Sequence, residues 1–293
     1  MKPGKLYVIA SPIGNLGDIS QRAADAINDA DFIAAEDTRV TGVLLSRLGI
    51  RKPMVSYHKF NETTRAPELA ARIMGSRAAS PQNCALITDA GSPGVSDPGQ
   101  TLVAQAAQQG IEIIPIPGPS AVTAALSISG FNGTTYGFYG FPPKGKKAKE
   151  ALISMLNDSH GIIILFESPN RITETVVLLQ ELQSTASLVL CNDLTKLYER
   201  IYRGTPEQVL EQLNANPNAH KGEYTLVIQK TPKPTEPDTS PSLSIEAKLT
   251  DICVKNAVSL KEAVTLLYNA EKTRLSKKDI YAASLNIKKL FVN

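Results

Sequence analysis

The chain has 293 residues, 42% of them hydrophobic, and a net charge of +3, so it is long enough for two ordinary globular domains. It has no run of eighteen uncharged apolar residues, which argues against a transmembrane helix, and its first short apolar run is typical of a strand rather than a signal peptide. The three cysteines lie far apart without CxxC spacing and the three histidines are scattered, which favours a reducing cytoplasm and argues against a disulfide framework or a metal site.

Short apolar runs alternate with helical patterns through the first part of the chain. The predicted strands are Leu6–Ala10, Phe32–Ala35, Met54–Tyr57, Ala85–Thr88 and Glu112–Ile116. The predicted helices are Ala23–Ala30, Val43–Leu48, Glu68–Met74 and Leu102–Gln109, and a further helix, Ser120–Ser127, follows the last of these strands at the start of the next domain. This alternation indicates an α/β domain, residues 1–118, with a mostly parallel sheet covered by helices on both faces.

A second α/β domain is predicted for residues 119–230. Its predicted strands are Thr135–Gly140, Ile162–Phe166, Ser187–Cys191, Glu199–Arg203 and Tyr224–Gln229. Its predicted helices are Ala148–Leu156, Ile172–Leu182 and Pro206–Leu213. Neighbouring strands that resemble hairpins indicate a mixed sheet.

The last part of the chain has a different character. Residues 231–242 are rich in proline and polar side chains, which predicts an extended linker. Three short helices follow in residues 243–293, at Ile245–Val254, Leu260–Tyr268 and Lys277–Ser284, with Ser259 and Ser276 as N-caps. This segment carries nine basic and five acidic side chains, whereas the other 242 residues carry 22 and 23. We expect a small all-α, helix-turn-helix-like domain with a polyanionic partner.

The loop Asp89–Gly99 is the most informative motif. It holds three glycines, two prolines and two aspartates directly after a predicted strand. Proline fixes the backbone and removes a donor, and glycine lets the chain pass close to a ligand. Because open α/β sheets bind ligands at the carboxyl ends of their strands, the loop predicts a small-molecule site.

Five other loops follow predicted strands, and each leaves a structural alternative open. They are Ser11–Asp18, Glu36–Arg39, Pro117–Ala121, Gly140–Lys149 and Phe166–Arg171. The acids and the arginine of Glu36–Arg39 could orient a ribose or transfer a proton, or could be solvated. Ser11–Asp18 could form a ligand wall or an ordinary βα loop, and Pro117–Ala121 could bind a phosphate at a helix N-terminus or only cap that helix through Ser120. The four lysines of the fourth loop could grip phosphates or face solvent, and Arg171 could hold a phosphate or pair with Glu167. No Walker lysine motif or G-x-G-x-x-G occurs, so neither a nucleoside triphosphate nor a dinucleotide is implied.

Seven motifs occur in one order and carry a family resemblance. They are SPIGNLGD, AEDTR, DAGSPGVSDPG, PGPSA, GFPPK, ESPNR and GEYTLVI. Together they resemble the bacterial small-subunit ribosomal RNA ribose methyltransferases of the tetrapyrrole methylase superfamily, from Lys5 to Ile228. The three-helix tail resembles the C-terminal domain of that family. At Asn192–Lys196 the match is less close, because the family usually has an Arg-Glu pair before Leu-Thr-Lys.

The resemblance implies a two-domain, class III methyltransferase fold with S-adenosylmethionine in the cleft between the α/β domains. It implies 2′-O-methylation of a cytidine ribose, a homodimer, a cytoplasmic location, and small-subunit ribosomal RNA or the assembled subunit as partner. The implied cofactor contacts are Pro12, Asp89, Ala90, Gly91, Ser92, Gly94, Val95, Ser96, Asp97, Ser120, Ala121, Phe166, Leu194, Tyr224 and Thr225.

A ribose hydroxyl must lose a proton as it attacks a methyl group, so we expect a nearby acceptor. The candidate bases are Asp37, Glu36 and Asp18, with Lys196 or Arg39 to steady the developing alkoxide. The candidate RNA contacts are Asn15, Lys144, Lys146, Lys147, Lys149, Arg171, Lys277 and Lys278.

Two other functions are compatible with parts of the sequence. A tetrapyrrole C-methyltransferase would share the cofactor cleft but would not need the basic tail. A ligand-sensing DNA-binding regulator would use the last three helices as a reader, although the tail lacks an obvious recognition helix rich in Arg, Asn or Gln.

Overall fold

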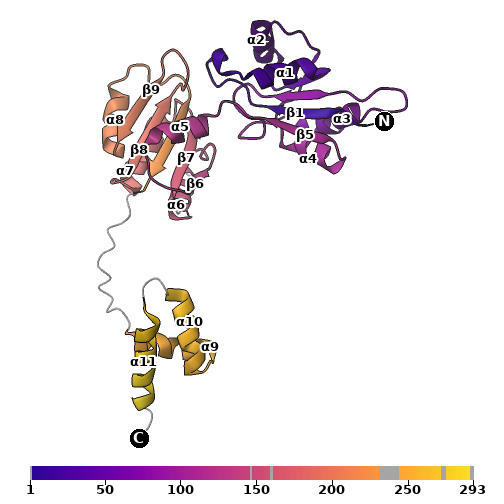
Figure 1. The fold of residues 1–293 in the computed structure, drawn as a ribbon. Helices are drawn as coiled ribbons and strands as arrows, with labels where there is room; N and C mark the ends of the chain where they lie inside the picture. The colour runs from indigo at the N-terminus through magenta and orange to yellow at the C-terminus, as the bar shows by residue number, and fades with distance from the viewer. Residues whose placement is uncertain (1, 146, 159–160, 231–243, 272–274, 291–293) are drawn as a thin grey trace. The chain divides into compact units, whose positions relative to one another are not determined.

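The computed structural model describes residues 2–145, 147–158, 161–230, 244–271 and 275–290, which form the units Met1–Thr231 and Pro232–Asn293 (Figure 1). The predicted linker at 231–242 and Lys146 lie outside the described residues. Within the described ranges, each helix is too short or too polar to cross a membrane.

The first sheet has five parallel strands in the order β3-β2-β4-β1-β5, which confirms the predicted parallel sheet. The strands are β1 (Lys5–Ile9), β2 (Phe32–Ala35), β3 (Met54–Ser56), β4 (Cys84–Ile87) and β5 (Glu112–Ile116). One face is covered by α1 (Gln21–Asp29) and α2 (Thr38–Leu48), and the other by α3 (Glu62–Met74) and α4 (Gln100–Gln108).

Alternation along the strands explains this arrangement. Leu6 packs with the apolar side chains of α3 and α4, whereas its neighbour Tyr7 and Ile9 pack with those of α1 and α2. Successive side chains of a strand point to opposite faces, and a strand covered on both sides is apolar throughout. Since all five strands are parallel, the loops at their carboxyl ends gather at one edge of the sheet.

The second sheet has the order β6-β7-β10-β8-β9 and confirms the predicted mixed sheet. Its strands are β6 (Tyr136–Phe138), β7 (Ile162–Glu167), β8 (Ser187–Asn192), β9 (Arg200–Gly204) and β10 (Tyr224–Gln229). Only β6 and β7 pair in parallel; the other three pairs are antiparallel. One face packs on α6 (Lys147–Asp158), α7 (Ile172–Leu182) and α8 (Pro206–Asn214), and the other on α5 (Ala121–Ser129).

Two helices begin five or more residues earlier than predicted. Helix α2 begins at Thr38 instead of Val43, because the Asp37 carboxylate caps it and accepts a 2.8 Å hydrogen bond from the Arg39 N–H. Helix α3 begins at Glu62 instead of Glu68 and contains Pro67. Proline lacks the N–H that would bond four residues back, and its ring crowds the carbonyl there; burial of the rest of the helix offsets this cost. A short 3₁₀ turn at Leu16–Asp18 was not predicted.

The C-terminal unit consists of α9 (Ile245–Asn256), α10 (Leu260–Glu271) and α11 (Lys277–Leu290) around a small apolar core. Both predicted N-caps are present. The Ser259 hydroxyl accepts from the Glu262 N–H at 3.3 Å, and the Ser276 hydroxyl accepts from the Asp279 N–H at 3.1 Å.

Candidate active site

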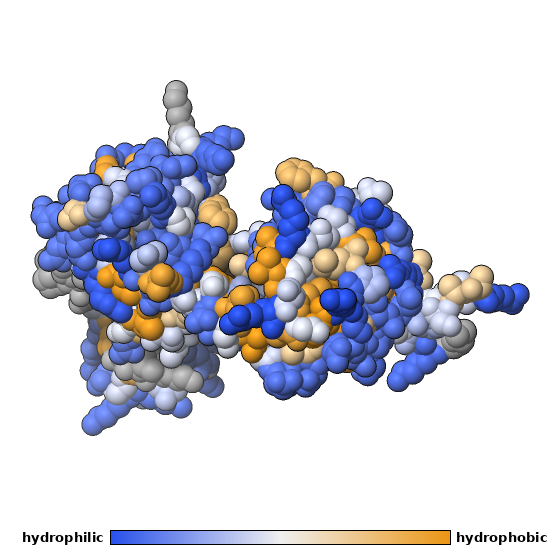
Figure 2. Space-filling model, turned by 90° about the horizontal axis from the view of Figure 1, so that it is seen from above, coloured by the Kyte–Doolittle hydropathy of each residue, from blue (hydrophilic) through white to orange (hydrophobic). Residues whose placement is uncertain are grey.

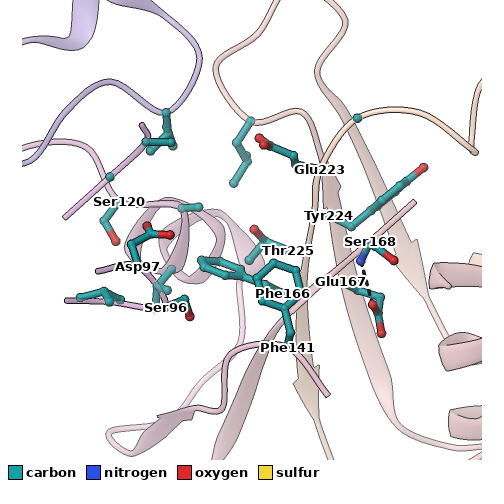
Figure 3. Close-up of a pocket in the computed structure, with 18 of the residues that line it drawn as sticks. Ser96, Asp97, Ser120, Phe141, Phe166, Glu167, Ser168, Glu223, Tyr224 and Thr225 are labelled. Atoms are coloured by element: carbon teal, nitrogen blue, oxygen red, sulfur yellow. Dashed lines mark hydrogen bonds between the residues drawn. The ribbon is translucent and has the colours of Figure 1, made fainter. Parts of the chain in front are cut away.

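One cavity of about 310 Å³ lies among loops of both sheets within the first unit (Figure 3). Its lining comes from the loop after β4 of the first sheet, from the start of α5, which packs on the second sheet, and from the end of β7 and the start of β10. The lining residues are Ile13, Ala90–Ser92, Val95–Asp97, Ser120–Val122, Phe141, Phe166–Pro169, Leu194 and Gly222–Thr225. The strand-end loops that the sequence singled out therefore meet at one place.

The loop after β4 is held in shape by its backbone. Gly91 exchanges two hydrogen bonds with Ser11, at 2.9 and 3.1 Å, which joins this loop to the loop after β1. Gly91 has φ +76°, a conformation that glycine adopts without strain. Ser96 has φ +67° although it carries a side chain. Residues with a strained backbone of this kind are often found at ligand sites, where the surrounding structure holds them in place.

Aromatic side chains form one wall of the cavity. The Phe166 ring packs edge-to-face against Phe138 and Phe141, with centroid distances of 4.7 and 5.6 Å. Phe141 and Phe166 also line the cavity, as Figure 3 shows. Fixed ring edges and faces of this kind can hold a planar heterocycle or a cation.

A buried ion pair supports this wall. The Glu167 carboxylate accepts from the Thr175 hydroxyl at 2.8 Å and the Ser168 N–H at 2.7 Å, and lies 2.6 Å from an Arg171 nitrogen. Arg171 also donates to the carbonyls of Pro142 and Pro143, at 3.0 and 3.3 Å. Arg171 thus pairs with Glu167, which is the structural role that the sequence left open for it. Its hydrogen bonds to the two carbonyls hold the loop that carries Phe141.

Carboxylates raise one another's pKa on the side of the cavity formed by the first sheet. Burial and the neighbouring carboxylates of Glu36, Asp89 and Glu223 raise the pKa of Asp97 to about 6. Burial also raises the pKa of Glu36 and of Asp89. The Asp89 N–H donates to the Glu36 carboxylate at 3.2 Å, which links the ends of β2 and β4. This negative region favours a cationic ligand.

Asp37 differs from these three acids because an arginine holds its carboxylate. Its carboxylate forms a two-point ion pair with Arg39, with N–O distances of 3.1 and 2.6 Å. These hydrogen bonds from Arg39 lower the pKa of Asp37 to about 2. A carboxylate with so low a pKa accepts a proton poorly near neutral pH.

Lys196 connects the loop after β8 to the start of β10. Its ammonium lies 2.8 Å from the Asp193 carboxylate and 2.9 Å from that of Glu223. Burial lowers the pKa of Lys196, but the two carboxylates outweigh burial and raise it. Because Glu223 lines the cavity, Lys196 orients a cavity carboxylate.

Most predicted cofactor contacts line the cavity: Ala90, Gly91, Ser92, Val95, Ser96, Asp97, Ser120, Ala121, Phe166, Leu194, Tyr224 and Thr225. Ser120 also caps α5, which is the structural alternative for its loop. Pro12 and Asp89 line a neighbouring hollow instead, and Gly94 lies within the loop without reaching the cavity surface. Asp18 lies in the exposed 3₁₀ turn.

Sequence reasoning missed several cavity residues, chiefly Ile13, Phe141, Gly222 and Glu223. Gly222 and Glu223 immediately precede β10, and the GEYTLVI motif contained a signal for them. Gly222 has φ +85°, and a Cβ there would lie 2.2 Å from the Asp193 carboxylate. Only glycine fits at this position.

The candidate RNA contacts fall in separate places. Asn15 is exposed, and its N–H donates to the Thr195 hydroxyl at 3.1 Å. Lys144 and Lys147 are exposed, while Lys149 pairs with Glu181 at 2.8 Å. Lys277 and Lys278 are exposed at the start of α11 in the other unit.

Comparison with known proteins gives a consistent result. Residues 5–210 match the family of tetrapyrrole (corrin/porphyrin) methylases. The ribosomal RNA small subunit methyltransferase I of Synechocystis sp. is 39% identical over 285 residues, covering 97% of this chain and 98% of that protein. The protein of the same name from Haemophilus influenzae is 37% identical over 280 residues, covering 93% of this chain and 95% of that protein.

Solved structures share the fold. A diphthine synthase aligns with a TM-score of 0.57 and 15% identity, over 78% of this chain and 90% of that one. A conserved hypothetical protein from Aeropyrum pernix K1 aligns with a TM-score of 0.59 and 18% identity, over 98% of both chains. At these identities the likeness concerns the fold alone.

Proposed function

Because the chain belongs to the tetrapyrrole methylase family, we propose that it is an S-adenosylmethionine-dependent enzyme that methylates the 2′-hydroxyl of a cytidine in small-subunit ribosomal RNA. Relatives named as ribosomal RNA small subunit methyltransferases match this chain over nearly the whole length of both proteins. The observation that carries the proposal is the cavity to which strand-end loops of both sheets contribute.

The residues of the cavity fit the proposed cofactor. Phe166 and Phe141 offer aromatic surface for an adenine ring. The N-terminus of α5, at Ala121 and Val122, favours a carboxylate, because the first N–H groups of a helix have no partner within it. The Asp97 and Glu223 carboxylates offset the positive charge of a sulfonium and an ammonium.

Bound S-adenosylmethionine supplies a methyl group that is already activated for displacement. The main task of the protein is then to align the ribose oxygen with it and to accept the hydroxyl proton. Among the three candidate bases, Glu36 fits best. It is half-buried at the end of β2 with a raised pKa, whereas Asp37 is committed to Arg39 and Asp18 lies in an exposed turn.

Lys196 and Arg39 were the candidates for steadying the alkoxide. The Lys196 ammonium is held by two carboxylates, so we assign it the positioning of Glu223. Arg39 has a side chain that is 90% exposed beside the site, and it is the better candidate for contact with the ribose–phosphate backbone.

RNA binding is proposed for the exposed lysines of both units, Lys144, Lys147, Lys277 and Lys278, and for Asn15. Lys149 contributes less because Glu181 already neutralises it. Lys146, outside the described residues, remains part of the proposal. Arg171 positions the loop that carries Lys144, through its hydrogen bond to the Pro142 carbonyl, and we do not assign it a direct RNA contact.

A homodimer, an assembled small subunit as substrate and a cytoplasmic location complete the proposal. Exposed apolar side chains support a dimer, since Leu197 is 87% and Tyr198 75% exposed, and a second copy would cover them. Sedimentation measures this directly. The tetrapyrrole and DNA-binding alternatives have no comparable support, because the relatives that match over nearly the whole chain are named as ribosomal RNA small subunit methyltransferases.

The test is methyl transfer from labelled S-adenosylmethionine to small ribosomal subunits isolated from cells that lack this protein, followed by nucleoside analysis. The proposal predicts label in 2′-O-methylcytidine. Label in a base methyl group, or transfer only to a porphyrinoid, would contradict it. Naked small-subunit RNA, run in parallel, decides between the two forms of substrate.

A further inference from the structure

A second hollow lies beside the cofactor cavity. It has a volume of about 220 Å³ and is formed by the loop after β1, one face of α2 and the end of β4. Its apolar lining includes Leu16, Val40 and Val43, of which Val40 and Val43 are 44% and 62% exposed. Figure 2, seen from above, shows hydrophobic residues among hydrophilic ones on the face that carries α1 and α2.

A buried hydroxyl without a partner lines this hollow. Thr41 lies on α2 and is 2% exposed, and its Oγ1 atom makes no hydrogen bond with any described residue. An unpaired buried hydroxyl costs free energy, and native proteins keep few of them. Apolar side chains make up most of the rest of the lining, and its other polar residues are Ser11, Thr88 and Asp89, so a ligand with a polar group can supply the missing partner for Thr41.

The hollow and the cofactor cavity share a thin wall. The wall is the pair of hydrogen bonds between Ser11 and Gly91. Asp89 lines the hollow, and the next two residues, Ala90 and Gly91, line the cavity. One nucleotide can therefore place its ribose at the methyl donor and its base in the hollow.

We propose that this hollow binds the pyrimidine base of the nucleotide that is methylated, with the Thr41 hydroxyl and the Asp89 carboxylate as its polar contacts. The inference rests on the proposed function and names the substrate subsite. Apolar side chains such as Val40 and Val43 contact the faces of an unstacked base. A carboxylate accepts from the exocyclic amino group of cytosine but not from the carbonyl that uracil has there.

Two substitutions at Thr41 separate this role from a structural one. Thr41→Val keeps the shape and removes the hydroxyl, so it removes an unsatisfied buried polar atom and raises Tm by about 2–4 °C. Because the base loses a hydrogen bond, KM for small subunits rises roughly 3- to 10-fold while kcat stays within about twofold. Thr41→Ser keeps the hydroxyl and loses a methyl group, so Tm falls while KM stays near that of the wild type.

The matched control is Thr64→Val, an exposed helical threonine on α3, which leaves Tm and KM unchanged. Equal KM values for the wild type and Thr41→Val overturn the inference. So does a KM that rises in both Thr41 variants, because then the hydroxyl is not responsible. Absence of methyl transfer by the wild type instead defeats the proposed function.

The competing occupant of the hollow is a second copy of the chain. Val43→Glu, at the exposed rim, tests this by sedimentation. We expect the oligomeric state of the wild type to be retained. Dissociation caused by Val43→Glu would overturn the inference, since it would show that a partner chain covers the hollow.

Discussion

The carboxylate of Glu167 and the guanidinium of Arg171 lie 2.6 Å apart, with side chains that are 1% and 19% exposed. The same guanidinium donates hydrogen bonds to the carbonyls of Pro142 and Pro143. It therefore ties the end of β7 to the loop that brings Phe141 to the cavity. A buried ion pair thus controls the shape of one wall of the cofactor site.

Replacing Arg171 by methionine is expected to destabilise the first unit by about 3–5 kcal/mol, because it leaves the Glu167 carboxylate buried without its counter-charge. Urea denaturation measures this. Arg65→Met is the control, since Arg65 and Glu68 form an exposed pair that contributes about 0–1 kcal/mol. Equal losses in the two variants would show that the buried pair has no special role.

Cofactor binding is expected to weaken as the pH falls below about 6. Burial and nearby carboxylates raise the pKa of Asp97 to about 6 from its usual 3.8, so its charge is lost below that pH. Between pH 7 and pH 5 the affinity for S-adenosylmethionine falls by up to about tenfold, measured by calorimetry. Asp97→Asn binds more weakly at pH 7 and removes this dependence; an unaltered pH profile in that variant would contradict the role of Asp97.

The same raised pKa has the opposite effect on folding in the absence of cofactor. The folded state holds the Asp97 proton more tightly than the unfolded state, so this group favours folding below pH 3.8, and the contribution is lost as the pH rises through about 6. Asp97→Asn should therefore be more stable relative to the wild type at pH 7 than at pH 4. Thermal denaturation at the two pH values provides the comparison.

Glu36→Gln is expected to reduce the single-turnover rate of methylation by about 10²-fold or more while cofactor affinity stays within a few-fold, because the amide cannot accept the ribose proton. Asp37→Asn provides the contrast. Its carboxylate is engaged by Arg39 and caps α2, so its loss should lower stability more than the rate. A large loss of rate in Asp37→Asn together with a wild-type rate in Glu36→Gln would reverse the assignment of the base.

The exposed lysines are expected to control the salt dependence of RNA binding. Replacing Lys144, Lys147, Lys277 and Lys278 by glutamine should reduce the slope of log K against log salt by about 0.7–0.9 for each phosphate that the protein no longer neutralises. Cofactor affinity should not change. Lys149→Gln should have a smaller effect than Lys147→Gln, because Lys149 is paired with Glu181. An unchanged slope in the fourfold variant would place the RNA elsewhere.

Much of the fold was predictable from local patterns. Strands such as Phe32–Ala35 are short apolar runs bounded by polar residues, and Ser120, Ser259 and Ser276 are side chains that cap helices. The start of α3 was not predictable in this way, because Pro67 suggested a helix boundary and only burial against the first sheet overrides that preference.

The candidate site was predictable where backbone chemistry marks it, and less so where distant side chains meet. Proline and glycine identify the Asp89–Gly99 loop from the sequence alone. The raised pKa of Asp97, in contrast, arises from burial and from Glu36 and Glu223, which lie 61 and 126 positions away in the chain. The sequence likewise does not reveal that the Thr41 hydroxyl lacks a partner, because this depends on how α2 packs beside the loops after β1 and β4.

The most direct test of the account is calorimetric titration with S-adenosylhomocysteine of the wild type, of Ala90→Leu and of Ala78→Leu. Ala90 lines the cavity, so leucine there occupies space that the cofactor needs, whereas Ala78 is exposed in the loop after α3. The account predicts one site per chain in the wild type and Ala78→Leu, and at least tenfold weaker binding in Ala90→Leu, about 1.4 kcal/mol. No binding by the wild type, or equal binding by all three proteins, would contradict it.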